Sequence, residues 1–371
     1  MSPDPRTTLS PGDPAPWFRV ASTSNPRYVF DTVAGRYVVL AFLGSAASAE
    51  ARAALAAVEA RRPLFDDERA SFFGVSTDPD DQAQGRLVES LPGVRFFLDF
   101  ERAVSRLYGA AGEDDGYRPF CLLLDPMLRV LARAPLERIG AVADLLATLP
   151  PPEDHAGAEI HAPVLILPRV FEPEFCRRLI EIYEQGEAQD SGFMREIDGK
   201  TVLVLDHAFK RRTDHELQDA AVIQAAKARI QRRIVPEIAK AFQFQVTRME
   251  RHLVACYDGE TGGWFRPHRD NTTAGTAHRR FAVTINLNAE AYEGGELMFP
   301  EFGPRRYKAP TGGAVVFGCG LLHTVAPVTR GRRYAFLPFL YDEAAARLRE
   351  ANNAHLGEGV GAYRSGDSPA A

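Results

Sequence analysis

Two histidines and one aspartate have the side-chain types and the spacing needed to hold a metal ion. His268 and Asp270 are separated by one residue, and on an extended strand two such positions point to the same face. His323 comes later, at the end of an apolar run, GAVVFGCGLLH, that we expect to be a strand. Two imidazoles and one carboxylate on one side of a metal leave the opposite coordination positions open, which suits Fe(II) oxygen chemistry. Zinc accepts the same donors, so metal-assisted hydrolysis is an alternative, although no general-base glutamate is obvious nearby.

Two further residues could hold an organic acid beside such a metal. Arg333 follows His323 in the next expected strand, and an inward-pointing guanidinium there could form a bidentate pair with the distal carboxylate of a dicarboxylic co-substrate. Tyr257, on the strand before His268, offers a hydroxyl to the same carboxylate. Taken singly, the arginine could form a surface ion pair and the tyrosine could pack in the core. The five residues in this order favour a binding site.

The elements around these residues predict a β-rich fold. From residue 249 to residue 340 the chain consists of short β-type runs separated by Gly, Pro and Asn, which is typical of a sandwich or jelly roll. We expect an amphipathic helix over about 173–185 and a longer helical region over about 215–242, broken near Pro236. Residues 187–213 carry no readable pattern, and we expect loops there.

The first part of the chain has a different pattern of apolar and helical segments. Short apolar runs at 38–43, 72–76, 95–98 and 120–124 alternate with helical stretches, which predicts an α/β layer with a partly parallel sheet. The proline-rich run that starts at Pro150 interrupts this pattern. We therefore predict four segments: an α/β domain at 1–150, a linker at 151–159, a β-rich domain with supporting helices at 160–345, and a mostly flexible tail at 346–371.

The β-rich domain resembles the prolyl 4-hydroxylase-like group of 2-oxoglutarate- and Fe(II)-dependent dioxygenases. The stretches that carry the resemblance are CYDGETGGWFRPHRD, RRFAVTINLN, YEGGELMFP and APTGGAVVFGCGLLHTVAPVTRGRRYAF. By position, His268, Asp270 and His323 match the iron ligands of that group, and Tyr257 and Arg333 match residues that bind 2-oxoglutarate. Many members carry Lys where Arg333 stands, and Arg retains its charge.

The resemblance implies a double-stranded β-helix that uses Fe(II), 2-oxoglutarate and O2, with ascorbate as a further cofactor candidate. Such an enzyme hydroxylates an unactivated C–H bond and releases succinate and CO2. The substrate implied is a prolyl or other residue of a peptide or protein, or a small molecule. A carboxylate at Asp270 favours hydroxylation over halogenation, because a small residue there would leave room for a halide.

The α/β domain resembles the peroxiredoxin (AhpC/TSA) family of thioredoxin-like folds. The stretches that carry this resemblance are PGDPAPWF, GRYVVLAFL, FFGVSTDPDD, FFLDFERAVSRLYGA and RPFCLLLDP. That family has its peroxidatic cysteine at the first turn of the helix after the first core strand, where residues 44–49 of this chain read GSAASA. Cys121 lies inside an apolar run and should be buried, and Arg118 matches the active-site arginine as a remnant. We expect a degenerate redoxin module that serves as a scaffold, a homodimer interface or a docking element.

Composition narrows the remaining classes. With 45% hydrophobic and 25% charged residues, the chain has the make-up of a soluble globular protein. The net charge of −5 gives no reason to expect nucleic acid as a partner, because binding to nucleic acid needs a clustered basic face. The amino terminus has no apolar signal segment, no stretch is long enough for a membrane helix, and the four cysteines are widely spaced. We therefore expect a cytoplasmic enzyme. The alternative from another class is a non-catalytic interaction protein in which the metal site is vestigial.

Overall fold

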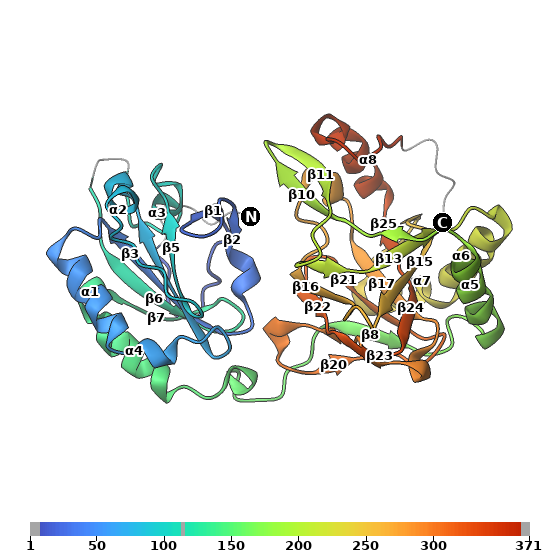
Figure 1. Cartoon of the computed structure of the whole chain (residues 1–371), viewed down its shortest axis with the longest axis horizontal. Coiled ribbons are helices and arrows are strands. Elements are labelled where there is room, and N and C mark those ends of the chain that lie inside the picture. Colours follow the sequence, from blue (N-terminus) through green and yellow to red (C-terminus); the bar gives the residue numbers. More distant parts are fainter. Residues whose placement is uncertain (1–7, 113–115, 365–371) are drawn as a thin grey trace. The chain divides into compact units, whose positions relative to one another are not determined.

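The structure is a computed structural model in which residues 8–112 and 116–364 are described (Figure 1). It divides into two compact units. The first unit comprises the chain up to residue 161 together with residues 300–304, and the second unit comprises residues 162–299 and the chain from residue 305 onward. The sequence placed a linker at 151–159, slightly before this division.

A seven-stranded mixed sheet forms the centre of the first unit. Its strands are β1 (Arg19–Ser22), β2 (Tyr28–Val29), β3 (Tyr37–Gly44), β4 (Ala70–Ser76), β5 (Val94–Leu98), β6 (Phe120–Leu124) and β7 (Val130–Pro135). Their order across the sheet is β2-β1-β5-β4-β3-β6-β7, with β3, β4 and β5 parallel and the outer strands antiparallel. Every residue of β3 and β4 is buried, as expected for central strands covered on both faces.

Helices cover the sheet of the first unit. They are α1 (Ala49–Glu59), α2 (Pro79–Ala83), α3 (Ala103–Leu107) and α4 (Ile139–Thr148). The apolar sides of α1 and α4 pack against one face of the sheet in a single buried cluster (Figure 1). Aromatic rings fill the other face, where Phe73 stacks on Phe97 at 4.8 Å. The predicted thioredoxin-like fold is confirmed, with β7 and α4 as elements that the sequence reading had not identified.

The second unit contains four longer helices. They are α5 (Pro173–Gln185), α6 (Ala220–Arg233), α7 (Val235–Phe242) and α8 (Glu343–Ala351). The prediction for α5 is confirmed, since Phe175, Leu179 and Tyr183 form one buried stripe at helical spacing. The predicted helical region is confirmed from Ala220 to Phe242, with a break at Ile234, but its start at residue 215 is wrong. Helix α6 begins at Ala220 because Asp219 caps it, and residues 213–216 form a strand.

Two larger sheets build the second unit. Its strands are β8 (Val164–Leu167), β9 (Gln189–Asp190), β10 (Phe193–Ile197), β11 (Lys200–Val204), β12 (Lys210–Arg211), β13 (Thr213–Glu216), β14 (Arg248–Glu250), β15 (Leu253–Asp258), β16 (Trp264–His268), β17 (Phe281–Asn286), β18 (Glu293–Gly294), β19 (Leu297–Met298), β20 (Arg306–Tyr307), β21 (Ala314–Gly318), β22 (His323–Val325), β23 (Val328–Arg330), β24 (Arg332–Phe336) and β25 (Phe339–Tyr341). The large sheet runs β14-β25-β17-β24-β15-β13-β9, with β21 on β17 and β8 on β21. The small sheet runs β12-β16-β22-β19-β20.

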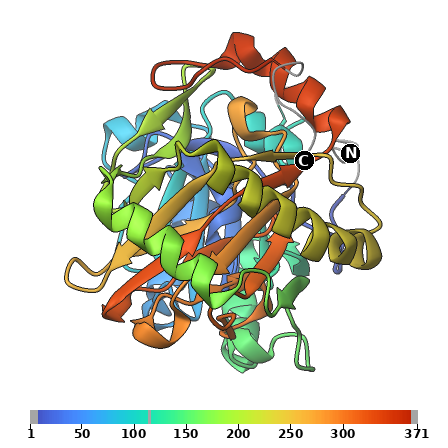
Figure 2. The same cartoon turned by 90° about the vertical axis from the view of Figure 1, so that its right-hand side faces the viewer.

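The two sheets enclose an interior. Helices α5, α6 and α7 lie across the outer face of the large sheet, where Val254 and Phe336 belong to the main apolar core (Figure 2). Because side chains alternate along a strand, the neighbouring residues face the other way. Phe317 of β21 does so, and its ring lies 4.6 Å from the ring of His323 on the small sheet. The predicted double-stranded β-helix is therefore confirmed.

The last described residues of the chain pack against the hairpin formed by β10 and β11. Strands β10 and β11 pair antiparallel, and the Gly357 amide donates to the Thr201 carbonyl at 2.8 Å. Farther on, Tyr363 is buried against Tyr341 and α8. The prediction of a flexible tail from residue 346 is therefore wrong for residues 346–364, and residues 365–371 lie outside the described residues. Among the helices that the structure describes, none has both the length and the apolar character to cross a bilayer.

Candidate metal centre

The three candidate ligands come together at the junction of two strands of the small sheet. His268 is the last residue of β16 and lies opposite His323, the first residue of β22, across an irregular antiparallel ladder. Asp270 follows after the strand has ended, and its amide donates to the Cys319 carbonyl at 3.0 Å. The sequence reading placed His323 at the end of the run from residue 313, but β21 ends at Gly318 and His323 begins a strand of its own.

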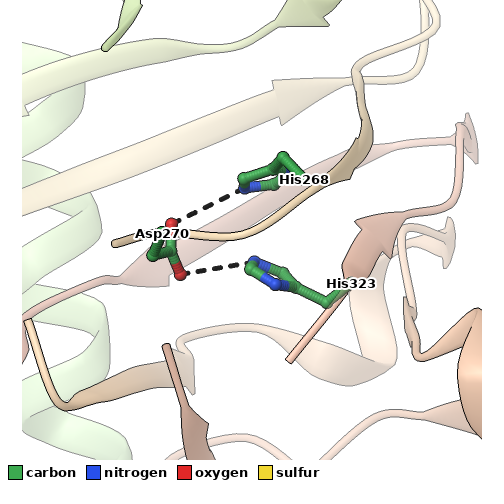
Figure 3. Close-up of side chains that lie close together, drawn as sticks. All are labelled: His268, Asp270 and His323. Carbon is green, nitrogen blue, oxygen red and sulfur yellow. Dashed lines mark ion pairs between the residues drawn. The ribbon is translucent and has the colours of Figure 1, made fainter. Parts of the chain in front are cut away.

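The ligand atoms converge on one point (Figure 3). The Nε2 atom of His268 lies 3.6 Å from one carboxylate oxygen of Asp270, and Nε2 of His323 lies 3.4 Å from the other. One donor atom from each residue falls within 4.8 Å of the other two, and no other group of three such side chains is found among the described residues. Three donors at these separations can share a single ion.

Backbone carbonyls fix the orientation of both imidazoles. Nδ1 of His268 lies 2.8 Å from the Arg266 carbonyl, and Nδ1 of His323 lies 3.0 Å from the Leu321 carbonyl. A ring nitrogen bonded to a carbonyl must carry the proton, so the opposite nitrogen keeps a free lone pair. Both Nε2 atoms are therefore prepared to donate to a metal.

Burial and mutual proximity set the charges of this group. Burial opposes ionisation of Asp270, but His323 and His268 outweigh it and hold the pKa of Asp270 well below its ordinary value. Burial, followed by the effect of His268, lowers the pKa of His323 to about 4. At neutral pH the carboxylate is ionised and the His323 imidazole is neutral, which are the states in which these groups bind metals.

Aromatic side chains surround the ligands. The ring of Phe265 stacks on His268 with the centroids 3.5 Å apart, and Phe317 packs edge-on against His323. Two neighbouring aromatic residues of β16 differ in what they contact. Phe265 contacts a ligand ring, whereas Trp264 lies half-buried under the Arg211 guanidinium. The apolar contacts restrict the rotation of both imidazoles.

Arg333 and Tyr257 lie together on the inner face of the large sheet. They are directly opposite one another on β24 and β15, and the guanidinium carbon of Arg333 sits 4.9 Å from the centre of the Tyr257 ring. Small side chains, Ala255 and Ala335, occupy the next inward positions on the same two strands. The inner face of the sheet thus presents a guanidinium and a phenol next to a surface that carries only small side chains.

The Arg333 guanidinium has an unsatisfied hydrogen-bonding capacity. The residue is only 2% exposed, yet its Nε and Nη1 atoms find no hydrogen-bond partner among the described residues. The buried hydroxyl of Tyr292 likewise lacks a hydrogen-bond partner within residues 8–112 and 116–364, and its pKa is raised by burial and lowered in turn by the nearby Arg333. Buried donors of this kind are costly unless something accepts from them, so the arrangement fits an anionic ligand that is bound in function.

Three inward-facing residues near this site were not predicted to have a role. Tyr292 lies in the YEGGEL stretch, so the resemblance could have singled it out. Lys210 and Arg212 fall in the segment that was expected to be loop, and both are buried. Their neighbours are polar, so no apolar alternation marks them.

Two other histidines of this unit, His252 and His278, are not part of the metal group. Nε2 of His278 instead lies 3.2 Å from a carboxylate oxygen of Glu250.

The redoxin unit holds a serine network at the position of the peroxidatic cysteine. Ser48 caps α1 by accepting from the Ala51 amide at 3.0 Å. In the preceding turn, the Ala46 amide donates to the buried Asp81 carboxylate at 2.7 Å. Cys121 is buried on β6, and burial raises the pKa of its thiol to about 12. A reactive thiolate is therefore offered neither at the start of α1, where Ser48 stands, nor at the buried Cys121.

Comparisons with known proteins agree with both units. Residues 252–341 match the family model described as the 2OG-Fe(II) oxygenase superfamily, and residues 11–132 match the AhpC/TSA family. A PKHD-type hydroxylase from Synechococcus sp. (strain JA-2-3B'a(2-13)) is 34% identical over 127 residues, which are 30% of this chain and 56% of the relative. The PKHD-type hydroxylase PiuC of Pseudomonas aeruginosa is 38% identical over 91 residues, covering 22% of this chain and 39% of the relative. The chain thus spans about half or less of the length of these curated relatives.

Two solved structures are similar to this chain, one to each unit. A Pseudomonas putida prolyl-4-hydroxylase has 19% identity and a TM-score of 0.37, covering 55% of this chain and 100% of that chain. The peroxidoxin BcpB from Mycobacterium tuberculosis has 20% identity and a TM-score of 0.32, covering 38% and 96%.

The fold and the two family matches define a redoxin-type unit joined to an oxygenase-type jelly roll. The stretch that matches the AhpC/TSA family model, residues 11–132, has no cysteine between residues 44 and 49. The stretch that matches the 2OG-Fe(II) oxygenase model, residues 252–341, lies in the second unit. The chain is a fusion of these two domain types.

Proposed function

We propose that this chain is an Fe(II)- and 2-oxoglutarate-dependent dioxygenase that hydroxylates an unactivated C–H bond. The observation that carries the proposal is the pairing of two features in one jelly roll. Two imidazoles and a carboxylate converge on the small sheet, and on the inner face of the large sheet lies a buried guanidinium whose Nε and Nη1 atoms have no hydrogen-bond partner in the described part of the chain. A structural metal site alone would leave the unpartnered Arg333 unexplained.

The donor set suits iron with open positions. His268, Asp270 and His323 would hold the ion from one side, through Nε2 of each imidazole and a carboxylate oxygen. Zinc hydrolysis would need a further carboxylate as a general base, and the ligand-type group among the described residues contains Asp270 alone. The vestigial-site alternative is less consistent with Nε2 atoms that are still oriented towards a common point.

Arg333 would bind the distal carboxylate of 2-oxoglutarate, with Tyr257 beside it. A carboxylate accepts strong hydrogen bonds from a guanidinium, and Nε and Nη1 of Arg333 are buried with no hydrogen-bond partner among the described residues. Tyr292 would supply a further hydroxyl at the same place. Small inward residues next to Arg333 and Tyr257 leave room for the carbon chain of the co-substrate.

Iron and 2-oxoglutarate, when bound, supply the oxidising chemistry, in which O2 is consumed and succinate and CO2 are released. The chain's own contribution is to position and to exclude water. Carbonyl bonds from Arg266 and Leu321 hold the imidazoles in the required tautomer. Phe265 and Phe317 cover the ligand rings with apolar surface and reduce the access of water. The substrate is a peptide or a small molecule, and the redoxin unit would dock a partner or pair two copies.

The test is succinate formation from 2-oxoglutarate under air by the full chain with ferrous iron. We expect uncoupled turnover in the wild type that is lost in His268→Ala. Metal binding provides a readout that does not depend on turnover: Mn(II) titration should show one site in the wild type and a large loss of affinity in Asp270→Asn. An acidic residue outside the group, such as Glu260→Gln on an exposed turn, is the matched control and should change neither measurement. A wild-type chain that binds neither Mn(II) nor 2-oxoglutarate would rule out the enzyme.

A further inference from the structure

Lys210 and Arg212 lie where the chain crosses from one sheet to the other. Strand β12 joins the small sheet, with Lys210 opposite Phe265 of β16. Strand β13 joins the large sheet, with Thr213 opposite Cys256 of β15. Arg212 is the residue between these two strands, so the pair stands at one margin of the interior that holds the metal centre.

Arg212 continues the row formed by Tyr257 and Arg333. Since Thr213 lies opposite Cys256, the preceding residue falls beside Tyr257, and Arg212 Nη1 lies 3.4 Å from the Tyr257 hydroxyl. The side chain is 4% exposed. Its Nε atom has no hydrogen-bond partner among the described residues. A second buried guanidinium with a free donor therefore faces the interior, on the other side of Tyr257 from Arg333.

Lys210 places an amine close to the metal ligands. Its Nζ lies 4.8 Å from the centre of the Phe265 ring, and that ring stacks on His268. The same Nζ donates to Ser191 Oγ at 2.7 Å and to the Gly192 carbonyl at 2.6 Å, so two of the three ammonium protons have acceptors within the described residues. Burial, and the neighbouring Arg212, hold the pKa of Lys210 well below its ordinary value, and an anion beside the amine would oppose both effects.

One carboxylate serves this group. Oδ2 of Asp214 accepts from Arg212 Nη2 at 2.6 Å and lies 3.4 Å from Arg251 Nη2, so it is already shared between two cations. Its Oδ1 has no partner among the described residues, but the carboxylate carries a single charge whichever oxygen is used. The cations of this group therefore outnumber its anions.

Charge counting in the loaded site leads to the same result. In the proposed function, the two positive charges of iron and the one of Arg333 are balanced by Asp270 and by the two carboxylates of 2-oxoglutarate. Asp214 already pairs with Arg212 and Arg251, so Lys210 has no carboxylate of its own when it is protonated. Buried charges are normally paired, because an isolated one loses its hydration without compensation.

We propose that Lys210 and Arg212 bind a carboxylate of the primary substrate, which makes the hydroxylated molecule an organic acid or a peptide with an acidic side chain near the reacting carbon. This inference rests on the proposed function, since it assigns the substrate class of the same site. A purely structural lysine would explain the bonds to Ser191 and Gly192. It would not explain the free Nε of Arg212 or the excess charge.

The experiment uses the full chain loaded with Mn(II) and N-oxalylglycine, an unreactive analogue of 2-oxoglutarate. Acetate is the probe, and the melting temperature is followed as sodium acetate replaces sodium chloride at constant ionic strength. We expect a saturable rise in the wild type. Lys210→Met, of similar volume, should weaken the apparent acetate affinity at least tenfold. Lys210→Arg should restore most of it, and Arg211→Gln, at the next residue, where the half-buried side chain packs on Trp264, should behave as the wild type.

The outcomes separate this inference from the proposed function. If Mn(II) and N-oxalylglycine leave the melting temperature of the wild type unchanged, the proposed function fails. If both bind but acetate has no effect, or acts equally on Lys210→Met, the carboxylate site is refuted and the proposed function stands. Retained Mn(II) and N-oxalylglycine binding by Lys210→Met shows that the variant is folded, and Lys210→Arg tests the charge if it is not.

Matched ligands identify the source of the carboxylate. N-acetylproline against its amide represents a free acid, and capped Pro-Glu against capped Pro-Gln represents an acidic side chain. The pair whose acidic member alone raises the melting temperature, with the rise lost in Lys210→Met, names the source. Equal rises from an acid and its neutral partner would contradict recognition by charge.

Discussion

Replacing Arg333 by Met should stabilise the protein while removing its affinity for 2-oxoglutarate. The side chain is 2% exposed, and two of its nitrogens have no partner among the described residues. Each buried unsatisfied donor costs about 1–3 kcal/mol. The cation–π contact with Tyr257, which the substitution also removes, contributes about 1–2 kcal/mol. With two such donors, the balance predicts a gain of up to about 5 kcal/mol in the free energy of unfolding without co-substrate.

The same substitution should have the opposite effect on binding. Truncating one partner of a buried, hydrogen-bonded charge pair costs about 2–5 kcal/mol. The dissociation constant of 2-oxoglutarate should therefore increase by a factor that lies between about 30 and several thousand. This opposition of sign distinguishes a binding residue from a structural one, because a structural arginine would lose stability when it is replaced.

Tryptophan fluorescence can report both quantities. The chain has two tryptophans, Trp17 and Trp264, and in a Trp17→Phe background the signal comes from β16, beside the metal centre. Urea titrations without ligand would give stability, and titration with 2-oxoglutarate in the presence of Mn(II) would give affinity. Arg332→Met is the matched control, because its exposed guanidinium pairs with Asp258 and should alter stability by about 1 kcal/mol or less and affinity not at all. A destabilised Arg333→Met that still binds 2-oxoglutarate would refute the reasoning.

Three further predictions concern the redoxin unit. Arg95 holds the pKa of Asp67 down to about 2 against the opposing effect of burial, so Asp67→Asn should lose about 2 kcal/mol at pH 7. Since a depressed carboxyl pKa contributes stability above its unfolded value of 3.8, that difference should disappear as the pH falls towards 2 in denaturation curves. Asp81→Ala removes the buried carboxylate that accepts from the Ala46 amide, the Ser76 hydroxyl and the Arg86 guanidinium, and should cost about 3 kcal/mol by the same assay. Ser48→Cys should add one iodoacetamide-reactive thiol at the start of α1, counted by mass spectrometry, whereas Cys121 stays unmodified in the native protein.

Elements with an apolar face were readable in the sequence. Helix α5 and strand β6 begin and end where the patterns placed them, because each presents a continuous apolar surface to a core. The segment KRRTDHE was misread because β12 and β13 turn their inward sides to a polar interior. Hydrophobic periodicity detects burial only where the interior is apolar. Polar strands around a ligand site look like exposed loop.

The candidate site was predictable to a similar extent. His268, Asp270 and His323 were named from residue type and spacing, and the structure brings them together. Their role as iron ligands, and the role of Tyr257 and Arg333 towards 2-oxoglutarate, remain predictions. The reason given for His268 and Asp270, a shared face of one strand, holds only in part, because β16 ends at His268 and a turn brings Asp270 back.

The attachment of the last described residues to the β10–β11 hairpin has a practical consequence. Phe193 of that hairpin contacts Phe209 at 4.5 Å, and Phe209 contacts Phe265, whose ring lies on a ligand histidine. Trimming the chain before Gly357, or joining a bulky fusion partner close to Tyr363, would disturb the chain of ring contacts that connects this hairpin to His268. Variants that are meant to test the metal centre should therefore keep the chain intact through Tyr363.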